Sequence, residues 1–272
     1  MTPSSSWGRP SPRDVVKAFL RRDLQVALSY RLPFVLDGIS AAFTVVTFAL
    51  VGEIVGPGEV PGSYLAFTLL GVGVAVFLNA SIGLVGSGVR TEQVQGTLES
   101  LLATGVSPSA VAVGYAVYPM IWAVIVAVIT AVVGVAAGAR VPGANWGLAA
   151  LALVPGALAF AGLGFAGVGL VLVFKRGIGV LAWFIALLSL GAGQLFPPRL
   201  LPGWARVISQ ISPYTLCLEL TRSAMLNGAS LSVSVEKLLA LTAMAVVYLA
   251  LGLGALAAGL RRARKTGGLA GY

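Results

Sequence analysis

Long apolar runs alternate with short polar segments along the chain. Six runs are long enough to predict membrane-spanning helices, at residues 34–55, 63–89, 109–138, 147–174, 178–196 and 235–260. At about 1.5 Å of rise per residue, roughly 20 helical residues cross a hydrocarbon core of roughly 30 Å. The pattern therefore predicts an all-α integral membrane protein, in which residues 34–265 form a single domain of six transmembrane helices.

The first 33 residues differ from the rest of the chain. Residues 1–11 are rich in Ser, Pro and Gly and are expected to be disordered. From Pro12 to Arg31, apolar positions recur at helical spacing, with basic residues toward the other side. The apolar stripe consists of Val16, Leu20, Leu24, Ala27 and Leu28, joined by Val15 and Phe19. The segment is too polar to span, so we expect an amphipathic interfacial helix, for which lying on the surface is a commoner role than a specific lipid site.

The polar stretch 90–107, RTEQVQGTLESLLATGVS, separates the second and third runs. Thr91 can cap a helix, and Gly105 stands where a left-handed residue would end it. The apolar positions between them are Val94, Leu98, Leu101 and Leu102. Their spacing predicts a short amphipathic helix over 91–105. This helix is either a solvated connector or a docking element that offers its leucine ridge to a partner.

A second irregular segment, 198–228, lies between the last two runs. Three prolines in PPRLLPGW break the fifth run, and residues 203–211 can form a short helix. Ser212-Pro213 can begin another helix that ends before Asn227-Gly228. Its apolar face would be Leu216, Cys217, Leu220 and Ala224, and its polar face would pair Glu219 with Arg222. We expect two short re-entrant or outer helices that dip into the outer leaflet or pack on the spans.

Composition supports a membrane protein. The 272 residues are 58% hydrophobic and 10% charged, with a mean hydropathy of +0.95, whereas soluble domains carry about 25% charged residues. The net charge of +9 does not indicate nucleic acid as a partner, because the basic residues lie between the apolar runs.

The distribution of Lys and Arg predicts the orientation. With a cytoplasmic N-terminus, the inner segments hold 13 of these residues and the outer segments five. Cytoplasmic segments of membrane proteins are enriched in Lys and Arg. Both termini, the stretch 90–107 and the tail 266–272 are therefore expected in the cytoplasm. The outer basic residues would be Arg140, Arg199, Arg206, Arg222 and Lys237.

The sequence offers no catalytic or metal site. It has no histidine and one cysteine, Cys217, so imidazole catalysis, an internal disulfide and the usual zinc-ligand spacings are absent. Lys265-Thr266 fails as a phosphate loop, because Arg264 occupies the place of the second glycine. We expect this chain to bind no cofactor and to be no enzyme, so any nucleotide would be bound by another chain.

Few polar side chains interrupt the runs. Asp37 and Glu53 stand near the two ends of the first run, where their carboxylates can reach the interface. Asn79 lies deeper in the second run and Gln194 near the end of the fifth. A single amide in a span joins helices more often than it contacts a substrate. The glycines of the second and fourth runs permit close helix packing.

Two stretches carry a family resemblance. The first is EQVQGTLESLLATGVSPSAVAVGY, and the second is FPPRLLPGWARVISQISPYTLCLELTRSAMLNG before the last run. The matching positions of the first are Glu92, Gly96, Thr97, Leu98, Glu99, Leu101, Leu102, Thr104, Val106 and Ser107. In this order on a six-span frame, they resemble the type-2 permease family of ATP-binding-cassette exporters. Gly105 departs from the pattern, since many members have proline there, but glycine also ends a helix.

The resemblance implies partners. Such permeases pair with an identical or related permease in the plasma membrane of a prokaryote, and clasp two cytoplasmic ATPase subunits that bind ATP and Mg. The residues that would couple to the ATPase are Glu92, Val94, Gly96, Thr97, Leu98, Glu99, Leu101, Leu102 and Thr104. The pathway would run between the permeases, beside membrane lipids, and its candidate lining residues are Thr44, Thr47, Phe48, Asn79 and Gln194.

Three functional classes remain open. The resemblance favours an ATP-driven exporter, whereas an ion-coupled carrier would want buried carboxylates or an internal repeat. A lipid-modifying membrane enzyme would need His, Asp or Glu gathered at one depth. The aliphatic pathway suits a hydrophobic drug or a lipid. Polysaccharide and lipid-linked glycan exporters use the same frame, although aromatic side chains suited to sugars are sparse in spans 1, 2 and 5.

Overall fold

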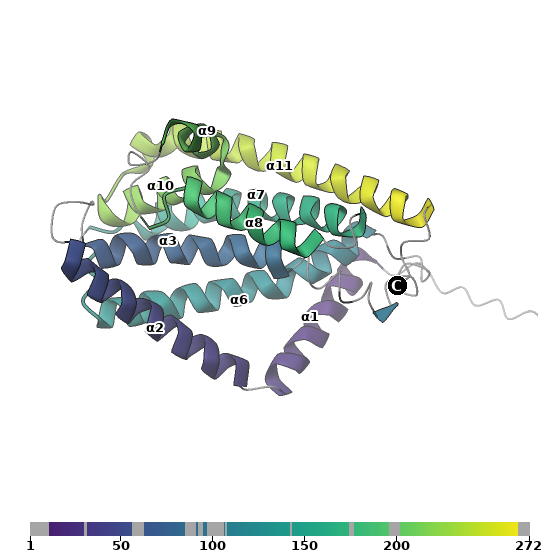
Figure 1. The fold of residues 1–272 in the computed structure, drawn as a ribbon, viewed down its shortest axis with the longest axis horizontal. Helices are drawn as coiled ribbons and strands as arrows, with labels where there is room; N and C mark the ends of the chain where they lie inside the picture. The colour runs from purple at the N-terminus through teal and green to yellow at the C-terminus, as the bar shows by residue number, and fades with distance from the viewer. Residues whose placement is uncertain are drawn as a thin grey trace, which may run out of the picture.

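A computed structural model describes residues 11–29, 32–55, 63–84, 91, 95–96, 106, 108–141, 143–173, 177–195 and 202–265. All regular secondary structure in these residues is helical, as the sequence predicts. The elements are α1 (Pro12–Ser29), α2 (Leu32–Val55), α3 (Tyr64–Asn79), the π-helical turn η1 (Ala80–Leu84), α6 (Pro108–Ala136), α7 (Trp146–Val173), α8 (Gly177–Gly191), α9 (Gly203–Ile211), α10 (Pro213–Leu226) and α11 (Leu231–Lys265). Figure 1 shows a bundle of long helices, with α1 and α2 meeting in a V at one side.

Five helices are long and apolar enough to cross a membrane. Their crossing parts are Val35–Ile54, Tyr64–Ile82, Val113–Ala136, Trp146–Leu172 and Leu231–Arg262. The remaining predicted run, 178–196, contains α8, whose 15 residues fall short of a core of roughly 30 Å. Gly193 has a φ of +66°, and this left-handed residue ends α8 earlier than the hydropathy indicates. The described residues thus form five candidate crossing helices and one shorter apolar helix, rather than six of full length.

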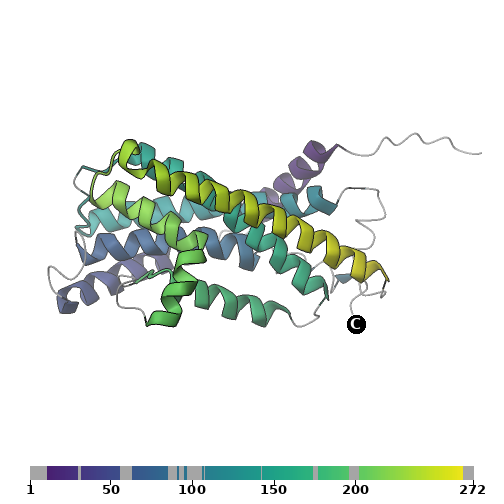
Figure 2. The ribbon, with the colours of Figure 1, turned by 90° about the horizontal axis from the view of Figure 1, so that it is seen from above.

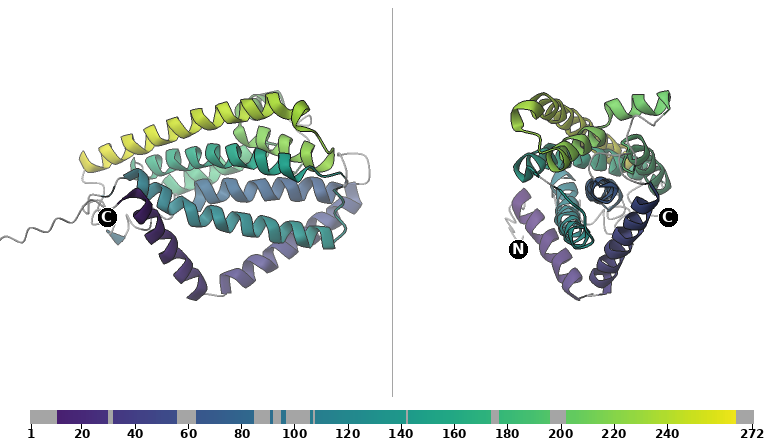
Figure 3. Two further views of the ribbon diagram at one scale, coloured as in Figure 1. Left: turned by 180° about the vertical axis from the view of Figure 1, so that it is seen from behind. Right: turned by 90° about the vertical axis from the view of Figure 1, so that its left-hand side faces the viewer.

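Helices α3 and α7 lie at the centre of the bundle. Both are mostly buried, whereas α2, α6 and α11 leave most of their apolar surface exposed. Seen end-on, α3 is surrounded by other helices (Figure 3). Leu78 of α3, Phe160 of α7 and Tyr214 of α10 are among the most deeply buried side chains. The exposed apolar faces of the outer helices are suited to lipid tails.

Helices α7 and α11 lie side by side and run in the same direction (Figure 1). Glycines allow their backbones to touch. A Cβ on Gly252 would overlap the carbonyl oxygen of Gly162, and a Cβ on Gly259 would lie 2.6 Å from that of Gly169. Small residues at such contacts let membrane helices approach closely. The prediction that glycines of the fourth run permit close packing is therefore confirmed for Gly162 and Gly169.

Helices α9 and α10 fold back across one end of the bundle (Figure 2). Ser212 is the N-cap of α10 and Pro213 stands in its first turn. Gly228, with a φ of +61°, follows its end, as the sequence predicts. The predicted apolar face of α10 is buried, with Cys217, Leu220 and Ala224 fully covered. Because α10 packs on α3 and α7, the segment 203–226 is anchored to the long helices.

The N-terminal helix α1 packs on α6 through one face. Val15 and Phe19 are buried, whereas Leu24 and Leu28 of the predicted apolar stripe are exposed. The face of α1 that packs on α6 is therefore centred on Val15 and Phe19 rather than on the whole apolar stripe predicted from the sequence. Leu24 and Leu28 are left for another apolar surface, which for an interfacial helix would be lipid.

Candidate functional site

The predicted docking helix is described at only three positions, Thr91, Gln95 and Gly96. Thr91 and Gln95 are helical and exposed. Gly96 has a φ of +72°, so a right-handed helix that reaches Gln95 does not continue through Gly96. The other predicted coupling residues lie outside the described part of the chain: Glu92, Val94, Thr97, Leu98, Glu99, Leu101, Leu102 and Thr104.

Val106, at the end of this stretch, is buried in a cluster that joins several helices. The other members of this cluster include Val15 and Phe19 of α1, Tyr115 of α6, Phe165 of α7 and Leu256 of α11. Because close-packed side chains transmit strain, a displacement at Val106 would reach the buried cluster that α1, α6, α7 and α11 share.

The contact between α1 and α6 is built around aromatic rings. Phe19 meets Tyr115 edge to face, with ring centroids 4.7 Å apart. The guanidinium of Arg22 lies over both rings, 4.8 Å from the Phe19 centroid and 5.4 Å from that of Tyr115. Gly114 makes room for Phe19, because a Cβ there would lie 2.8 Å from its Cγ. Edge-to-face rings and a cation over them are favourable arrangements. These contacts therefore fix the position of α1 on α6.

Phe19→Ala is expected to loosen α1 from α6. The change removes the buried ring that Tyr115 and Arg22 contact, at a cost of about 2 kcal/mol for one large apolar side chain. Limited trypsin digestion in detergent should cut faster at Lys17, Arg21 and Arg22. Leu28→Ala, at an exposed position of the same helix, is the control and should digest like the wild type. Equal digestion of all three proteins would show that this contact does not hold α1.

Asp37 does not simply reach the interface. The indole Nε1 of Trp122 on α6 donates a hydrogen bond of 2.9 Å to its Oδ2. The carboxylate is half-buried, and this bond ties α2 to α6. The sequence places the two residues 85 positions apart, so no local pattern predicts the contact.

Three of the predicted pathway residues lie on α2. The hydroxyls of Thr44 and Thr47 donate to carbonyls of their own helix, Ser40 and Phe43, each at 2.8 Å. Phe48 packs on the cluster of Val45, Leu65 and Leu69. Thr47 is exposed, and the other two are half-buried. Neither threonine hydroxyl is left free to donate to a ligand.

Asn79 is exposed and ends α3, where the chain continues as the π-helical turn η1. Its side-chain amide donates to the carbonyl of Ala75 at 3.0 Å. Ser81, within η1, is buried and donates to the sulfur of Met120 at 3.2 Å. Short π-helical turns often mark functional positions in helices, and the sequence did not predict this one. Asn79 and the three α2 residues do not hydrogen-bond to one another or to Gln194 within the described residues.

Gln194 follows α8 and belongs to a site that sequence reasoning missed. The carbonyl oxygens of Gly193 and Gln194 accept hydrogen bonds from Arg222 of α10, at 2.9 Å and 2.6 Å. Arg222 also donates to the carbonyl of Phe67 on α3, at 3.3 Å from Nε and 3.1 Å from Nη2. Its guanidinium carbon lies 3.4 Å from the centroid of the Phe67 ring. One buried side chain thus joins α3, α8 and α10.

The predicted pairing of Glu219 with Arg222 is wrong. Glu219 accepts from Lys237 of α11 at 3.0 Å, while Arg222 points into the protein and is only 9% exposed. Burial lowers the pKa of Arg222 to about 10, which leaves it charged at neutral pH. Gly71 completes the site, because a Cβ there would lie 2.9 Å from Nη2 of Arg222.

The neighbouring thiol is not reactive. Cys217 is fully buried, and burial raises the pKa of its thiol to about 12. A thiol needs to ionise to act as a nucleophile or metal ligand. Within the described residues, no three His, Cys, Asp or Glu side chains gather closely enough to hold a metal ion.

Comparison with known protein families gives a match. The family model described as ABC-2 type transporter matches residues 15–226, which is more than half of the chain. The match begins within α1 and ends at the last residue of α10. No curated protein matches the chain.

Proposed function

Because the chain belongs to the ABC-2 type transporter family, we propose that it is the permease subunit of an ATP-driven exporter. The observation that carries the proposal is the match over residues 15–226. It includes the amphipathic helix α1, the stretch 90–107 and the buried Arg222. The energy would come from a separate ATPase subunit that binds ATP and Mg.

The proposed topology has six crossings, with α8 as the short fifth one. Both termini and the stretch 90–107 face the cytoplasm of a prokaryotic cell, with 13 Lys and Arg residues inside and five outside. Two permease subunits, identical or related, clasp two ATPase subunits.

The stretch 91–105 would sit in a groove of the ATPase. Its leucine ridge supplies apolar contact, and Glu92 and Glu99 supply charge for a basic rim. Movement of the ATPase would reach the spans through Val106, which belongs to the buried cluster that α1, α6, α7 and α11 share. The left-handed Gly96 would place a bend inside the docking segment.

The pathway would lie between the two permease subunits, beside α2, α3 and α8. Arg222 links α3 to the end of α8, so these helices would move together. The exposed face of α2 is aliphatic and aromatic, with Phe43, Val46 and Leu50 more than half exposed. This surface favours a hydrophobic drug or a lipid-like substrate. Proteoliposomes loaded with a lipophilic dye or a lipid-linked glycan would separate the choices, since movement of the glycan alone would contradict a hydrophobic substrate.

The test of the exporter assignment is co-purification with the candidate ATPase. Glu92→Arg and Leu98→Asp should each reduce the bound ATPase about tenfold, the effect of losing one important interface contact. Glu236→Arg is the matched control, because it reverses an exposed carboxylate at the other end of the bundle, and it should bind like the wild type.

Two further outcomes decide the assignment. If the wild type carries no ATPase, the permease proposal fails. If all three variants bind and stimulate hydrolysis normally, residues 90–107 are only a connector.

A further inference from the structure

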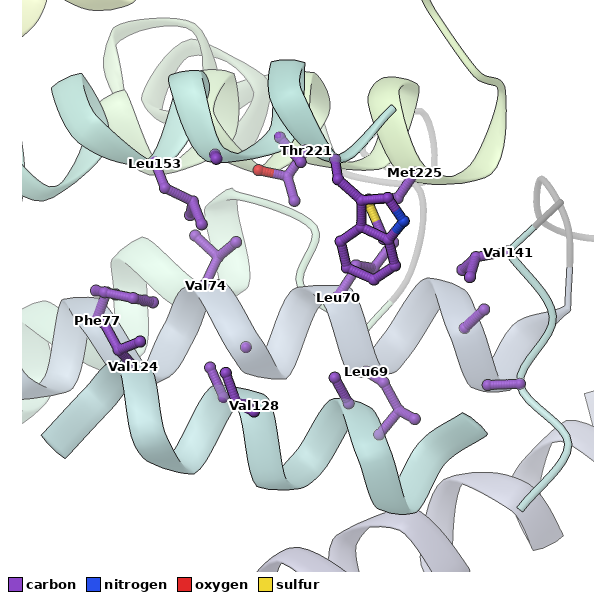
Figure 4. A pocket seen from close by; sticks show the side chains of 18 of the residues that line it. Leu69, Leu70, Val74, Phe77, Val124, Val128, Val141, Leu153, Thr221 and Met225 are labelled. Carbon is purple, nitrogen blue, oxygen red and sulfur yellow. The ribbon is translucent and has the colours of Figure 1, made fainter. Parts of the chain in front are cut away.

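A cavity of about 490 Å³ lies between α3, α6 and α7, with α10 at one end (Figure 4). Its volume is typical of small-molecule sites, which measure about 300–1,000 Å³. Leu69, Val74 and Phe77 of α3 face Val128 of α6 and Leu153 of α7 across it. None of the five proposed pathway residues lines it.

The lining is almost entirely apolar. The one hydroxyl side chain in it, Thr221, donates to the carbonyl of Cys217 at 2.8 Å. Water needs two to four polar partners to be held in a cavity, so an apolar cavity excludes it. A sugar or an ion would lose its hydrogen bonds to water here, and the apolar side chains offer none in their place. The chemistry of the walls admits hydrocarbon only.

The cavity opens sideways between two candidate membrane-spanning helices. Val128 of α6 and Val154 of α7 both line it and are more than half exposed. Alanines on both helices, among them Ala127 and Ala157, line the cavity, and their short side chains leave space in it. The medium at this depth of a membrane is lipid tail. An unfilled void would lose the dispersion contacts of its lining side chains. We therefore expect a lipid acyl chain from the bilayer to fill the cavity.

The end of the cavity nearest the α6–α7 loop has the groups of a membrane interface. Trp146, the first residue of α7, lines the cavity and is largely exposed. Arg140 stands between the lining residues Ala139 and Val141 and is exposed. Tryptophan favours the level of lipid headgroups, and an arginine there attracts phosphate.

We propose that this cavity binds one phospholipid. An acyl chain lies between α3, α6 and α7, and the phosphate lies at Arg140 and Trp146. Because the charge at the rim is positive, an anionic phospholipid binds better than a zwitterionic one. The site belongs to the permease chain alone and does not depend on which substrate is exported.

The experiment is native mass spectrometry of the full-length chain, released from nanodiscs of equal phosphatidylglycerol and phosphatidylcholine. Gly73 lines the cavity, and a Cβ built on it meets no atom within 4 Å. Gly73→Leu should therefore fill the cavity without a clash and remove one retained lipid. Gly254→Leu is the matched control: a Cβ on Gly254 also meets no atom within 4 Å, and the residue lies on the exposed side of α11. It should retain the lipid.

Arg140→Gln tests the headgroup contact separately. It should lower the preference for phosphatidylglycerol about fivefold, the effect of one basic side chain near an anionic surface. The proposal is overturned if Gly73→Leu keeps the wild-type lipid count, or if Gly254→Leu loses as much lipid as Gly73→Leu. It is also overturned if a lipid-free Val128→Cys variant instead forms a disulfide-linked dimer through position 128. None of these measurements requires the ATPase. The lipid-binding proposal can therefore fail while the exporter proposal stands, and the reverse is also true.

Discussion

Gly252→Leu is expected to yield no folded protein. The new side chain would have to enter the space that the carbonyl of Gly162 occupies, where α7 and α11 touch backbone to backbone. Overfilling a packed contact usually costs about 1–3 kcal/mol, and the cost here should exceed this range, because backbone atoms rather than a flexible side chain must move. The measurement is size-exclusion chromatography in detergent, in which the folded peak should be lost.

The control for this variant stands two residues further along the same helix. Gly254→Leu adds the same side chain at an exposed position with no atom within 4 Å of its Cβ. It should elute and unfold like the wild type. A Gly252→Leu protein with a normal peak and unchanged thermal midpoint would mean that α7 and α11 are not in backbone contact.

Arg222→Met is expected to lower the free energy of unfolding by about 3 kcal/mol or more. Hydrogen bonds to a charged group contribute about 1.5–3 kcal/mol each, and removing the donor leaves buried carbonyls unsatisfied. Methionine has a similar length and removes the charge without leaving a large void. The carbonyls of Phe67, Gly193 and Gln194 would each lose the hydrogen bond that Arg222 donates. The thermal unfolding midpoint in detergent is the measurement.

Two comparisons sharpen this result. Arg222→Lys keeps the charge but not the planar guanidinium. Its free energy of unfolding should therefore fall between those of the wild type and Arg222→Met. Lys237→Met breaks the exposed pair with Glu219 and should cost no more than about 1 kcal/mol. If Arg222→Met has the same thermal unfolding midpoint as Lys237→Met, the buried guanidinium does not join the helices.

The helical class and most helix bounds could be predicted, because both depend on local sequence. Apolar runs and local stop signals predicted six spans, and five of them coincide with helices that are long and apolar enough to cross a membrane. Ser212-Pro213 and Gly228 marked the start and end of α10 as predicted. The helix over 91–105 was predicted from the same kind of signal. Of its three described residues, Thr91 and Gln95 are helical, whereas Gly96, at a φ of +72°, interrupts the helix.

The polar contacts could not be predicted, because they join residues far apart in the chain. Arg222 meets Phe67 across 155 positions, and Trp122 meets Asp37 across 85. Helical spacing placed Arg222 beside Glu219, but the fold of α10 against α3 and α8 turned it inward. The end of α8 was missed for a related reason: Ala192 and Leu195 continue the apolar pattern, while the backbone turns at Gly193.

The length of α8 has a consequence for the membrane itself. In the proposed topology its 15 residues reach about 22 Å, against a hydrocarbon thickness of roughly 30 Å. Such hydrophobic mismatch is met by local thinning of the bilayer, at a modest cost per ångström. The permease would thus carry a dimple in the membrane beside α8. A polar headgroup that crossed there would meet less hydrocarbon than in the unperturbed bilayer.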